Sequence, residues 1–233
     1  LFVADHVAIE GTKVGINSDV NIVAENLKIE NGMRVFDLRF EDETIKDIHL
    51  QMPGEHNVLN ASLAISMARK YGLTADQIKD ALATFSGVRR RFSFKVRNED
   101  CVYIDDYAHH PTEINAVYDA VRELYPNKKI VAIFQPHLFS RTNDFMDDFA
   151  TSLSKFDEIY LLDIYPAREL PMEGVTSQVL LDKMKNENKF LISKEQLIQF
   201  VSETNEEVLV TIGAGDIGEM VDEIKEILEN RLK

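Results

Sequence analysis

The spacing of hydrophobic residues changes partway along the chain. In the first part of the chain this spacing is typical of strands. Apolar and polar side chains alternate over residues 21–29, 33–40 and 44–52. A period of two indicates strands that bury one face. Asn31-Gly32 separates the first two stretches and favours a tight hairpin turn. We therefore expect residues 1 to about 50 to form strands.

Two helices are expected next. Residues 56–70 have helical spacing, with an apolar stripe of Leu59, Leu63, Ile65 and Met67. Thr74 should precede a second helix, because Gln77 follows three residues later and the pair matches a capping box. That helix is expected to end near Phe85-Ser86-Gly87, where Gly87 suits a helix exit. We place a domain boundary at the basic cluster Arg89-Arg90-Arg91, so that the domains cover residues 1–91 and 92–233.

Strands and helices alternate in the second domain. Short apolar runs stand at 101–104, 130–134, 159–162, 189–192 and 208–212. Amphipathic helices are expected near 112–125, 141–155, 176–187 and 194–203, with a last one at 216–231. Ser193 and Gln196 supply a second capping box. This alternation predicts an α/β fold in which helices cover both faces of a mostly parallel sheet.

Polar and titratable residues follow the ends of the apolar runs. They lie at 105–111, 135–137, 163–166 and 213–216. Open parallel sheets bind ligands outside the carboxyl ends of their strands. The sequence therefore predicts a functional site along that edge of the sheet.

The charge balance and the cysteine content narrow the class of protein. The chain has 40 acidic and 26 basic residues, a net charge of -14, which argues against a nucleic-acid partner but permits a small anionic ligand. Cys101 is the single cysteine, so no internal disulfide can form and a reducing, cytoplasmic location is the simpler interpretation. The apolar neighbours of Cys101 favour a buried strand position over a reactive thiol.

No part of the sequence indicates a membrane partner. No apolar stretch approaches the roughly 20 residues of a membrane span. The first residues, Leu1-Phe2-Val3, do not begin a signal peptide, and they start within a structural pattern. We expect the chain to continue upstream.

Two segments carry most of the candidate chemistry. The loop 105–111 contains two carboxylates, a phenol and two imidazoles, where a simple turn would more readily use Gly, Asn or Ser. A metal site is less favoured, because no further Cys or His spacing accompanies the histidines, and helix capping is the structural alternative. In the second segment His137 and Arg141 lie four residues apart at an expected helix start, which suits an anion. The alternative for Arg141 is an ion pair with Asp144.

Two further motifs have competing interpretations. Residues 213–218 match a dinucleotide fingerprint, but no second strand with an acidic residue follows, so a tight strand-to-helix turn is favoured over a nicotinamide site. His56, Asn57 and Asn60 stand in the first turn of an expected helix. Asparagine amides match the donor and acceptor edge of adenine, whereas helix capping explains Asn57 almost as well.

Together these segments resemble the Mur ligases of bacterial peptidoglycan synthesis. The shared motifs are Gly54-x-His56-Asn57-x-x-Asn60, Gly87-Val88-x-Arg90-Arg91-Phe92 and Asp106-Tyr107-x-His109-x-Pro111, and the resemblance runs from about residue 16. Within the family, the double histidine at 109–110 with Gln135-Pro136-His137 is similar to the branch that joins L-alanine to UDP-N-acetylmuramate. A related branch that uses murein tripeptide shares the double histidine but does not usually carry the second segment.

The resemblance implies a three-domain, ATP-dependent ligase. Residues 1–91 would be the C-terminal part of the central ATP-binding domain, and 92–233 a Rossmann-like C-terminal domain. The implied adenine pocket consists of His56, Asn57 and Asn60. Arg91 and Asp106 would reach the ribose and phosphates, and together with His109 they would be the catalytic residues. The implied alanine side is lined by Tyr107, His109, His137 and Arg141, and Leu138 stands where many relatives have Arg.

Family members use ATP and Mg²⁺ to form an acyl phosphate, which the amine of the amino acid then attacks. No G-x-x-x-x-G-K-[ST] phosphate loop occurs in this chain, so the loop and the metal ligands are expected in sequence outside it. We expect the 233 residues alone not to ligate alanine. The alternatives are the tripeptide ligase, a non-catalytic binding module of the same fold and, from residues 213–218 only, a nicotinamide oxidoreductase.

Overall fold

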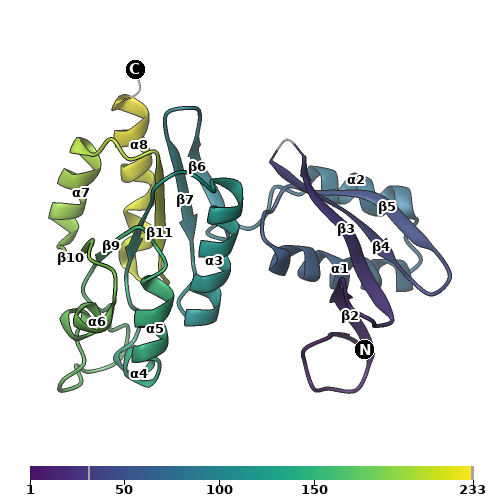
Figure 1. The fold of residues 1–233 in the computed structure, drawn as a ribbon, viewed down its shortest axis with the longest axis horizontal. Helices are drawn as coiled ribbons and strands as arrows, with labels where there is room; N and C mark the ends of the chain where they lie inside the picture. Colours follow the sequence, from purple (N-terminus) through teal and green to yellow (C-terminus); the bar gives the residue numbers. More distant parts are fainter. Residues whose placement is uncertain (31, 232–233) are drawn as a thin grey trace. The chain divides into compact units, whose positions relative to one another are not determined.

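Two separate sheets organise the chain, one on each side of the junction between Gly87 and Val88 (Figure 1). The computed structural model describes residues 1–30 and 32–231. The division lies four residues before the expected boundary at Arg91, because residues 90–92 belong to the second unit. The side chain of Arg90 donates to Asp105, and the backbone N–H of Phe92 donates to Asp106.

The sheet of the first unit has the strand order β1-β2-β3-β4-β5. Its strands are β1 (Phe2–Ala4), β2 (Thr12–Ile16), β3 (Ile22–Glu30), β4 (Met33–Arg39) and β5 (Thr44–Leu50). The first three strands run parallel, and β3, β4 and β5 pair antiparallel. Glu30 pairs with Met33, as the hairpin prediction requires, and Gly32 has a positive φ of 75°. Asn31, the other predicted turn residue, lies outside the described residues.

Helices α1 (Glu55–Lys70) and α2 (Ala75–Thr84) follow this sheet. The capping box of Thr74 and Gln77 is confirmed. The expected apolar stripe of α1 is wrong in part, since Met67 is 54% exposed. The buried face consists instead of Asn57, Val58, Ala61, Ser62, Ile65 and Ser66. Small side chains on that face permit close packing, and Val58, Ala61 and Ile65 join the core of the unit.

Helix α2 ends close to the expected residues 85–87, but Gly87 is not part of its cap. The helix ends at Thr84, and Phe85 takes an extended conformation with φ -75° and ψ 105°. Gly87 therefore lies in the connecting segment, where its φ of 93° is one that glycine adopts without strain.

The second unit contains the mostly parallel sheet that the alternating pattern predicts. Its strands are β6 (Ser93–Arg97), β7 (Val102–Asp106), β8 (Ile130–Phe134), β9 (Glu158–Leu161), β10 (Lys189–Leu191) and β11 (Val208–Ile212). The order across the sheet is β10-β9-β8-β11-β7-β6, and only β6 is antiparallel to its neighbour. This edge strand was not predicted, because its short segment has few apolar residues. The last strand, β11, lies between β7 and β8.

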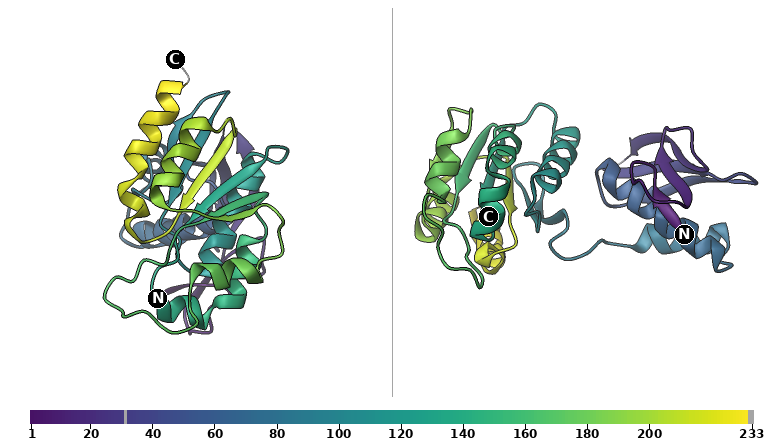
Figure 2. Two further views of the ribbon diagram at one scale, coloured as in Figure 1. Left: turned by 90° about the vertical axis from the view of Figure 1, so that its left-hand side faces the viewer. Right: turned by 90° about the horizontal axis from the view of Figure 1, so that it is seen from below.

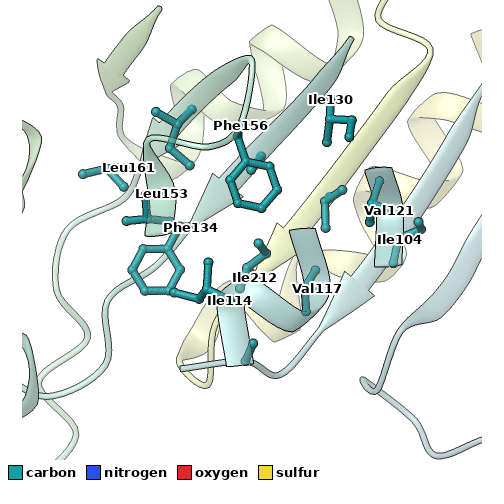
Figure 3. Close-up of a cluster of buried hydrophobic side chains, with 14 of the residues drawn as sticks. Ile104, Ile114, Val117, Val121, Ile130, Phe134, Leu153, Phe156, Leu161 and Ile212 are labelled. Atoms are coloured by element: carbon teal, nitrogen blue, oxygen red, sulfur yellow. The ribbon is translucent and has the colours of Figure 1, made fainter. Parts of the chain in front are cut away.

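Helices cover both faces of this sheet (Figure 2). They are α3 (Pro111–Leu124), α4 (Phe139–Asp144), α5 (Met146–Leu153), α6 (Ser177–Lys183), α7 (Lys194–Glu203), the 3₁₀ helix η1 (Asp216–Glu219) and α8 (Val221–Arg231). The apolar cluster beneath α3, α5 and α6 includes Ile104, Ile114, Phe134, Leu153 and Ile212 (Figure 3). A second cluster lies beneath α7 and α8 on the opposite face. Cys101 belongs to that second cluster and is 1% exposed, and burial raises the pKa of its thiol.

The helix predicted at 141–155 is in fact two helices separated at Phe145. This residue has φ -117° and ψ 24°, outside helical geometry, and its ring contacts the ring of His110 with centroids 4.6 Å apart. The helix is therefore interrupted at the residue whose ring packs against the start of α3. The predicted helix at 216–231 likewise begins as η1 and continues as α8.

The capping box at the start of α7 supplies a local test of stability. Ser193 Oγ accepts from Gln196 N at 3.2 Å, and Gln196 Oε1 accepts from Ser193 N at 2.8 Å. We expect Ser193→Ala to lower the free energy of unfolding by about 1 kcal/mol, because an N-terminal N–H group of the helix loses its acceptor. Thermal denaturation of Ser202→Ala, near the opposite end of α7, is the matched control. Equal effects of the two substitutions would contradict the prediction.

No helix in the described part of the chain combines the length and apolar character that a membrane crossing requires.

Candidate functional site

Sheet register brings the predicted loops to one edge of the second unit. Ile212 at the end of β11 pairs with Asp106 of β7 on one side and with Phe134 of β8 on the other. Phe134 in turn pairs with Leu161 of β9. The loops that follow these four strands therefore leave the sheet at the same edge, where side chains more than 100 residues apart in the sequence meet.

Four rings lie in succession along this edge. The centroids of Tyr107 and His109 are 5.4 Å apart, and those of His109 and His137 are 6.3 Å apart. Tyr165 stacks on His137 at 5.7 Å, and the two residues also form an isolated parallel bridge. The structure thus brings together the predicted Tyr107, His109 and His137. Tyr165 was not singled out from the sequence, although it lies in the loop after β9, at the predicted edge.

Arg141 points to His137 rather than to Asp144. Its Nη1 lies 3.3 Å from His137 Nδ1, and arginine is always a donor, so Nδ1 must accept. Burial and the neighbouring Arg141 lower the pKa of His137, which keeps its imidazole neutral at physiological pH. Among residues 1–30 and 32–231, no carboxylate forms an ion pair with Arg141. The guanidinium is therefore suited to a carboxylate supplied by a ligand.

The position of α4, which carries Arg141, depends on another residue that sequence reasoning missed. Glu169 accepts hydrogen bonds from the backbone N–H of Ser140, at 3.0 Å, and from the hydroxyl of the same residue. These bonds lower the pKa of Glu169. The loop after β9 is thus attached to the first turn of α4. Apart from the acidic side chain itself, no local pattern in the sequence indicated this contact.

Two oxygen atoms lie close to Nδ1 of the His109 ring. Nδ1 lies 2.9 Å from the carbonyl oxygen of Tyr107 and 3.4 Å from Glu113 Oε2, so it carries the proton. Glu113 also accepts from the backbone N–H of His109 at 2.9 Å. With Nδ1 protonated, Nε2 is the atom of neutral His109 that can accept a proton. This arrangement is typical of an oriented general base.

The adjacent carboxylates Asp105 and Asp106 are both buried but have different partners. Asp105 is fully buried and accepts from Arg90 Nε at 3.1 Å and from the Thr211 hydroxyl at 3.0 Å. The carboxylate of Asp106 accepts from the backbone N–H groups of Phe92 and Ala108, each at 2.7 Å. Asp106 therefore connects the segment 88–92 to the loop after β7.

Burial raises the pKa of Asp106 to about 6, although the two backbone N–H groups and Arg91 act in the opposite direction. The unfolded chain, with a pKa near 3.8, releases this proton at lower pH than the folded chain. The protonated side chain of Asp106 therefore stabilises the folded state in full below about pH 4. This stabilisation is lost as the pH rises to about 6. The pKa difference corresponds to about 3 kcal/mol.

This linkage predicts the pH dependence of a variant. Between pH 4 and pH 7, the stability of the natural chain relative to Asp106→Asn should fall by up to about 3 kcal/mol, because only the natural chain titrates at this position. Denaturant unfolding of both proteins at several pH values measures the difference, and other carboxylates cancel in it. A difference that does not change with pH would show that burial does not raise the pKa of Asp106.

The arginine predicted to reach a nucleotide is accessible in the structure. The side chain of Arg91 is 47% exposed, and its guanidinium lies 3.8 Å from Glu113 and 5.8 Å from the ring centroid of Tyr107. Arg91 is therefore close to the ring series and still able to contact an anionic ligand.

The glycines at 213–218 accommodate groups of the protein itself. A Cβ at Gly213 would lie 2.8 Å from the carbonyl oxygen of Gln135, and one at Gly215 would lie 2.3 Å from Gln135 Oε1. Gln135 donates to Asp216 at 2.7 Å and accepts from the N–H of Ile217 at 2.9 Å. These contacts account for the glycine spacing as a tight turn and give no support to a nicotinamide site.

The predicted adenine residues lie in the first unit, at the start of α1. Asn57 is 8% exposed, and its amide donates to the carbonyl oxygen of Pro53 at 2.7 Å. His56 and Asn60 are exposed. The spacing of three residues thus places Asn57 and Asn60 in different environments. Asn57 stabilises the turn before α1, and the adenine role of all three residues stays a prediction.

Comparison with known proteins relates the chain to one family. A family profile described as "Mur ligase, glutamate ligase domain" matches residues 90–215. A UDP-N-acetylmuramate–L-alanine ligase of Flavobacterium psychrophilum is 58% identical over 231 residues, which are 99% of this chain and 52% of that protein. The corresponding protein of Parabacteroides distasonis is 41% identical over 227 residues and 49% of its length. The chain thus spans about half the length of the curated relatives it matches.

Solved structures give the same result. The UDP-N-acetylmuramate–alanine ligase of Thermotoga maritima matches with a TM-score of 0.75 and 26% identity, over 95% of this chain and 47% of that one. A murein peptide ligase of Psychrobacter arcticus shares the fold, with a TM-score of 0.63 and 21% identity over 94% of this chain and 46% of that one. The match of the family profile to more than half of the residues shows that this chain belongs to the Mur ligase family.

Proposed function

We propose that this chain is part of an ATP-dependent ligase that joins L-alanine to UDP-N-acetylmuramate in the cytoplasm. The observation that carries the proposal is the pairing of Arg141, which has no ion-pair partner among the described residues, with neutral His137 beside the oriented base His109. An amino acid presents a carboxylate and an amine close together, and these side chains offer a partner for each. The names of the most similar relatives support alanine as the amino acid.

The residue roles follow from charge and exposure. Arg141 binds the carboxylate of alanine, and His137 positions its guanidinium. Nε2 of His109 takes the proton that the α-ammonium group must lose before its nitrogen can act as a nucleophile. Tyr107 and Tyr165 bound the space beside these histidines. Leu138 supplies no second positive charge at this end of the site.

The nucleotide end of the site is assigned by motif. We assign Arg91 to the phosphates of ATP, Asp106 to its ribose, and His56, Asn57 and Asn60 to its adenine. In this scheme residues 1–91 are the end of the ATP-binding domain. The exposed guanidinium of Arg91 fits a phosphate contact, whereas Asp106 would have to accept from a ribose hydroxyl in addition to its two backbone bonds.

The reaction assigned to the complete enzyme has two stages. ATP converts the carboxylate of UDP-N-acetylmuramate into an acyl phosphate. The amine of alanine then attacks the acyl carbon, an amide bond forms and phosphate leaves. The contribution of this chain is to bind and deprotonate the amino acid and to place positive charge beside the phosphates. No group of three His, Cys, Asp or Glu residues in the described ranges is arranged to hold a metal ion.

A chimeric enzyme tests the proposal. The part of the Flavobacterium psychrophilum ligase that this chain does not cover would be joined to residues 1–233 at the aligned position. We expect ATP-dependent release of phosphate that requires both L-alanine and UDP-N-acetylmuramate, with the amide product identified by mass. The natural relative is the positive control, and thermal unfolding establishes that the chimera is folded.

The outcomes separate the proposed function from its alternatives. Product formation with murein tripeptide in place of alanine would assign the chain to the tripeptide branch. A folded chimera without activity toward either amine would support a non-catalytic binding module. Ligation of alanine by the 233 residues alone would contradict the view that the phosphate-binding part of the enzyme lies elsewhere.

A further inference from the structure

Three consecutive arginines after the unit boundary have different environments. The side chain of Arg89 is 77% exposed and that of Arg91 is 47% exposed, whereas that of Arg90 is 17% exposed. The guanidinium of Arg89 lies 3.8 Å from the carboxylate of Asp222. Of the three side chains, that of Arg90 is therefore the one that is mostly buried.

Arg90 connects two strand ends through its side chain. Nε donates to the buried carboxylate of Asp105 in β7 at 3.1 Å, and Nη2 donates to the carbonyl oxygen of Gly213 after β11 at 2.6 Å. These acceptors lie in segments more than 100 residues apart in the sequence. A guanidinium can serve both because its donors project in a fixed plane, which the single ammonium group of lysine cannot reproduce.

The same residue also holds the loop after β7. The backbone carbonyl of Arg90 accepts from the N–H of Tyr107 at 2.8 Å, and its guanidinium lies 5.1 Å from the centroid of the Tyr107 ring. Arg90 has a positive φ of 60°, which is uncommon for a residue with a side chain. The hydrogen bonds of Arg90 maintain that backbone conformation. Arg91 is the next residue, so its direction depends on the conformation of Arg90.

Gly218 provides the space that the guanidinium occupies. A Cβ at this position would lie 2.3 Å from Arg90 Nη1 and 2.6 Å from Cζ. Because both Nε and Nη2 are already bonded, the guanidinium cannot turn away without losing one of these bonds. The last glycine of the 213–218 segment is thus explained by Arg90.

We propose that Arg90 is a positioning residue that attaches the segment 88–92 to the carboxyl edge of the parallel sheet and so orients Arg91 and Tyr107 in the site. The inference rests on the proposed function for what Arg91 and Tyr107 contact. The attachment itself rests only on the bonds of Arg90 to Asp105, Gly213 and Tyr107. Adjacent arginines then have separate tasks, since Arg90 holds the segment and Arg91 meets the ligand.

Hydrogen exchange on the 233-residue chain tests the attachment without requiring activity. We expect Arg90→Lys to accelerate exchange of the Tyr107 amide at least about tenfold, because its acceptor is no longer held in place. Gly218→Ala should have the same effect, since the added Cβ displaces the guanidinium while Arg90 itself is unchanged. Arg89→Lys is the matched control and should leave this amide unaffected. Unchanged exchange in both Arg90→Lys and Gly218→Ala would overturn the proposal.

Kinetics of the chimeric ligase test the positioning role. Below the unfolding temperature, Arg90→Lys and Gly218→Ala should each lower kcat/KM for ATP by about tenfold or more, because small displacements of aligned groups are costly. The double variant should be little worse than either single one, since both changes break the same contact. Arg89→Lys should remain within about twofold of the unmodified chimera. Accelerated Tyr107 exchange with unchanged kinetics would reduce Arg90 to a structural role, whereas an inactive unmodified chimera would count against the proposed function alone.

Discussion

Asp105→Ala is expected to destabilise the second unit by about 3–5 kcal/mol, the largest effect we predict for a single side chain. The substitution removes the carboxylate partner of Arg90 and leaves a mostly buried guanidinium without its charge partner. It also removes the acceptor of the Thr211 hydroxyl, which itself contacts the hydroxyl of Tyr103 at 3.0 Å. Hydrogen exchange of the amides in β7 and β11 measures the loss within this unit and does not require the whole chain to unfold in one step.

Two controls separate the ion pair from a general effect of losing a carboxylate. Asp163→Ala, at an exposed position after β9, should change stability by no more than about 0.5 kcal/mol. The double variant Arg90→Met with Asp105→Leu should be more stable than Asp105→Ala, because no buried charge is then left unpaired. A double variant as unstable as Asp105→Ala would show that packing, rather than charge pairing, dominates at this position.

Arg141→Ala in the chimeric ligase is expected to raise KM for L-alanine by about 100-fold while KM for ATP stays within about twofold. The guanidinium is the proposed partner of the alanine carboxylate and makes no ion pair with a described residue. Arg141→Lys should recover part of the affinity, because an ammonium group restores the charge but not the planar pair of donors. Initial rates at varied alanine concentration measure the effect.

The control for this prediction lies on the loop after β9. Arg168 is exposed there, and Arg168→Ala should leave both KM values near those of the unmodified chimera. A rise in KM for ATP alone after Arg141→Ala would place this arginine at the nucleotide end of the site and contradict the assignment.

Local sequence signals were sufficient for much of the fold. The apolar runs and amphipathic stretches of the second unit indicated its five parallel strands, because side-chain direction repeats with a different period in strands and helices. Both capping boxes, at Thr74 and Ser193, were visible because their partners are only three residues away. The carboxyl edge was indicated as well, since every parallel strand ends there. Errors appeared where packing overrides the local pattern, as at Phe145 and on the buried face of α1.

The site could be predicted as a set of residue types but not as a set of contacts. His109, His137 and Arg141 were singled out because imidazole and guanidinium groups are uncommon choices for simple turns, and their roles stay predictions. Tyr165 and Glu169 were missed, because their importance comes from stacking on His137 and from binding Ser140 in another loop. The different environments of Arg90 and Arg91 were equally hidden, since neighbouring residues of one type have the same local pattern.

The sequence by itself therefore determined which segments become strands and helices, at which edge of the sheet the polar loops meet and which family the motifs resemble. Only the tertiary structure decided that β11 lies between β7 and β8, and with it the partners of the buried polar groups. Asp105, Thr211 and Gly213 meet Arg90 because two strands distant in sequence are neighbours in the sheet. A buried charge must find its partners wherever folding places them, and that placement has no period along the chain.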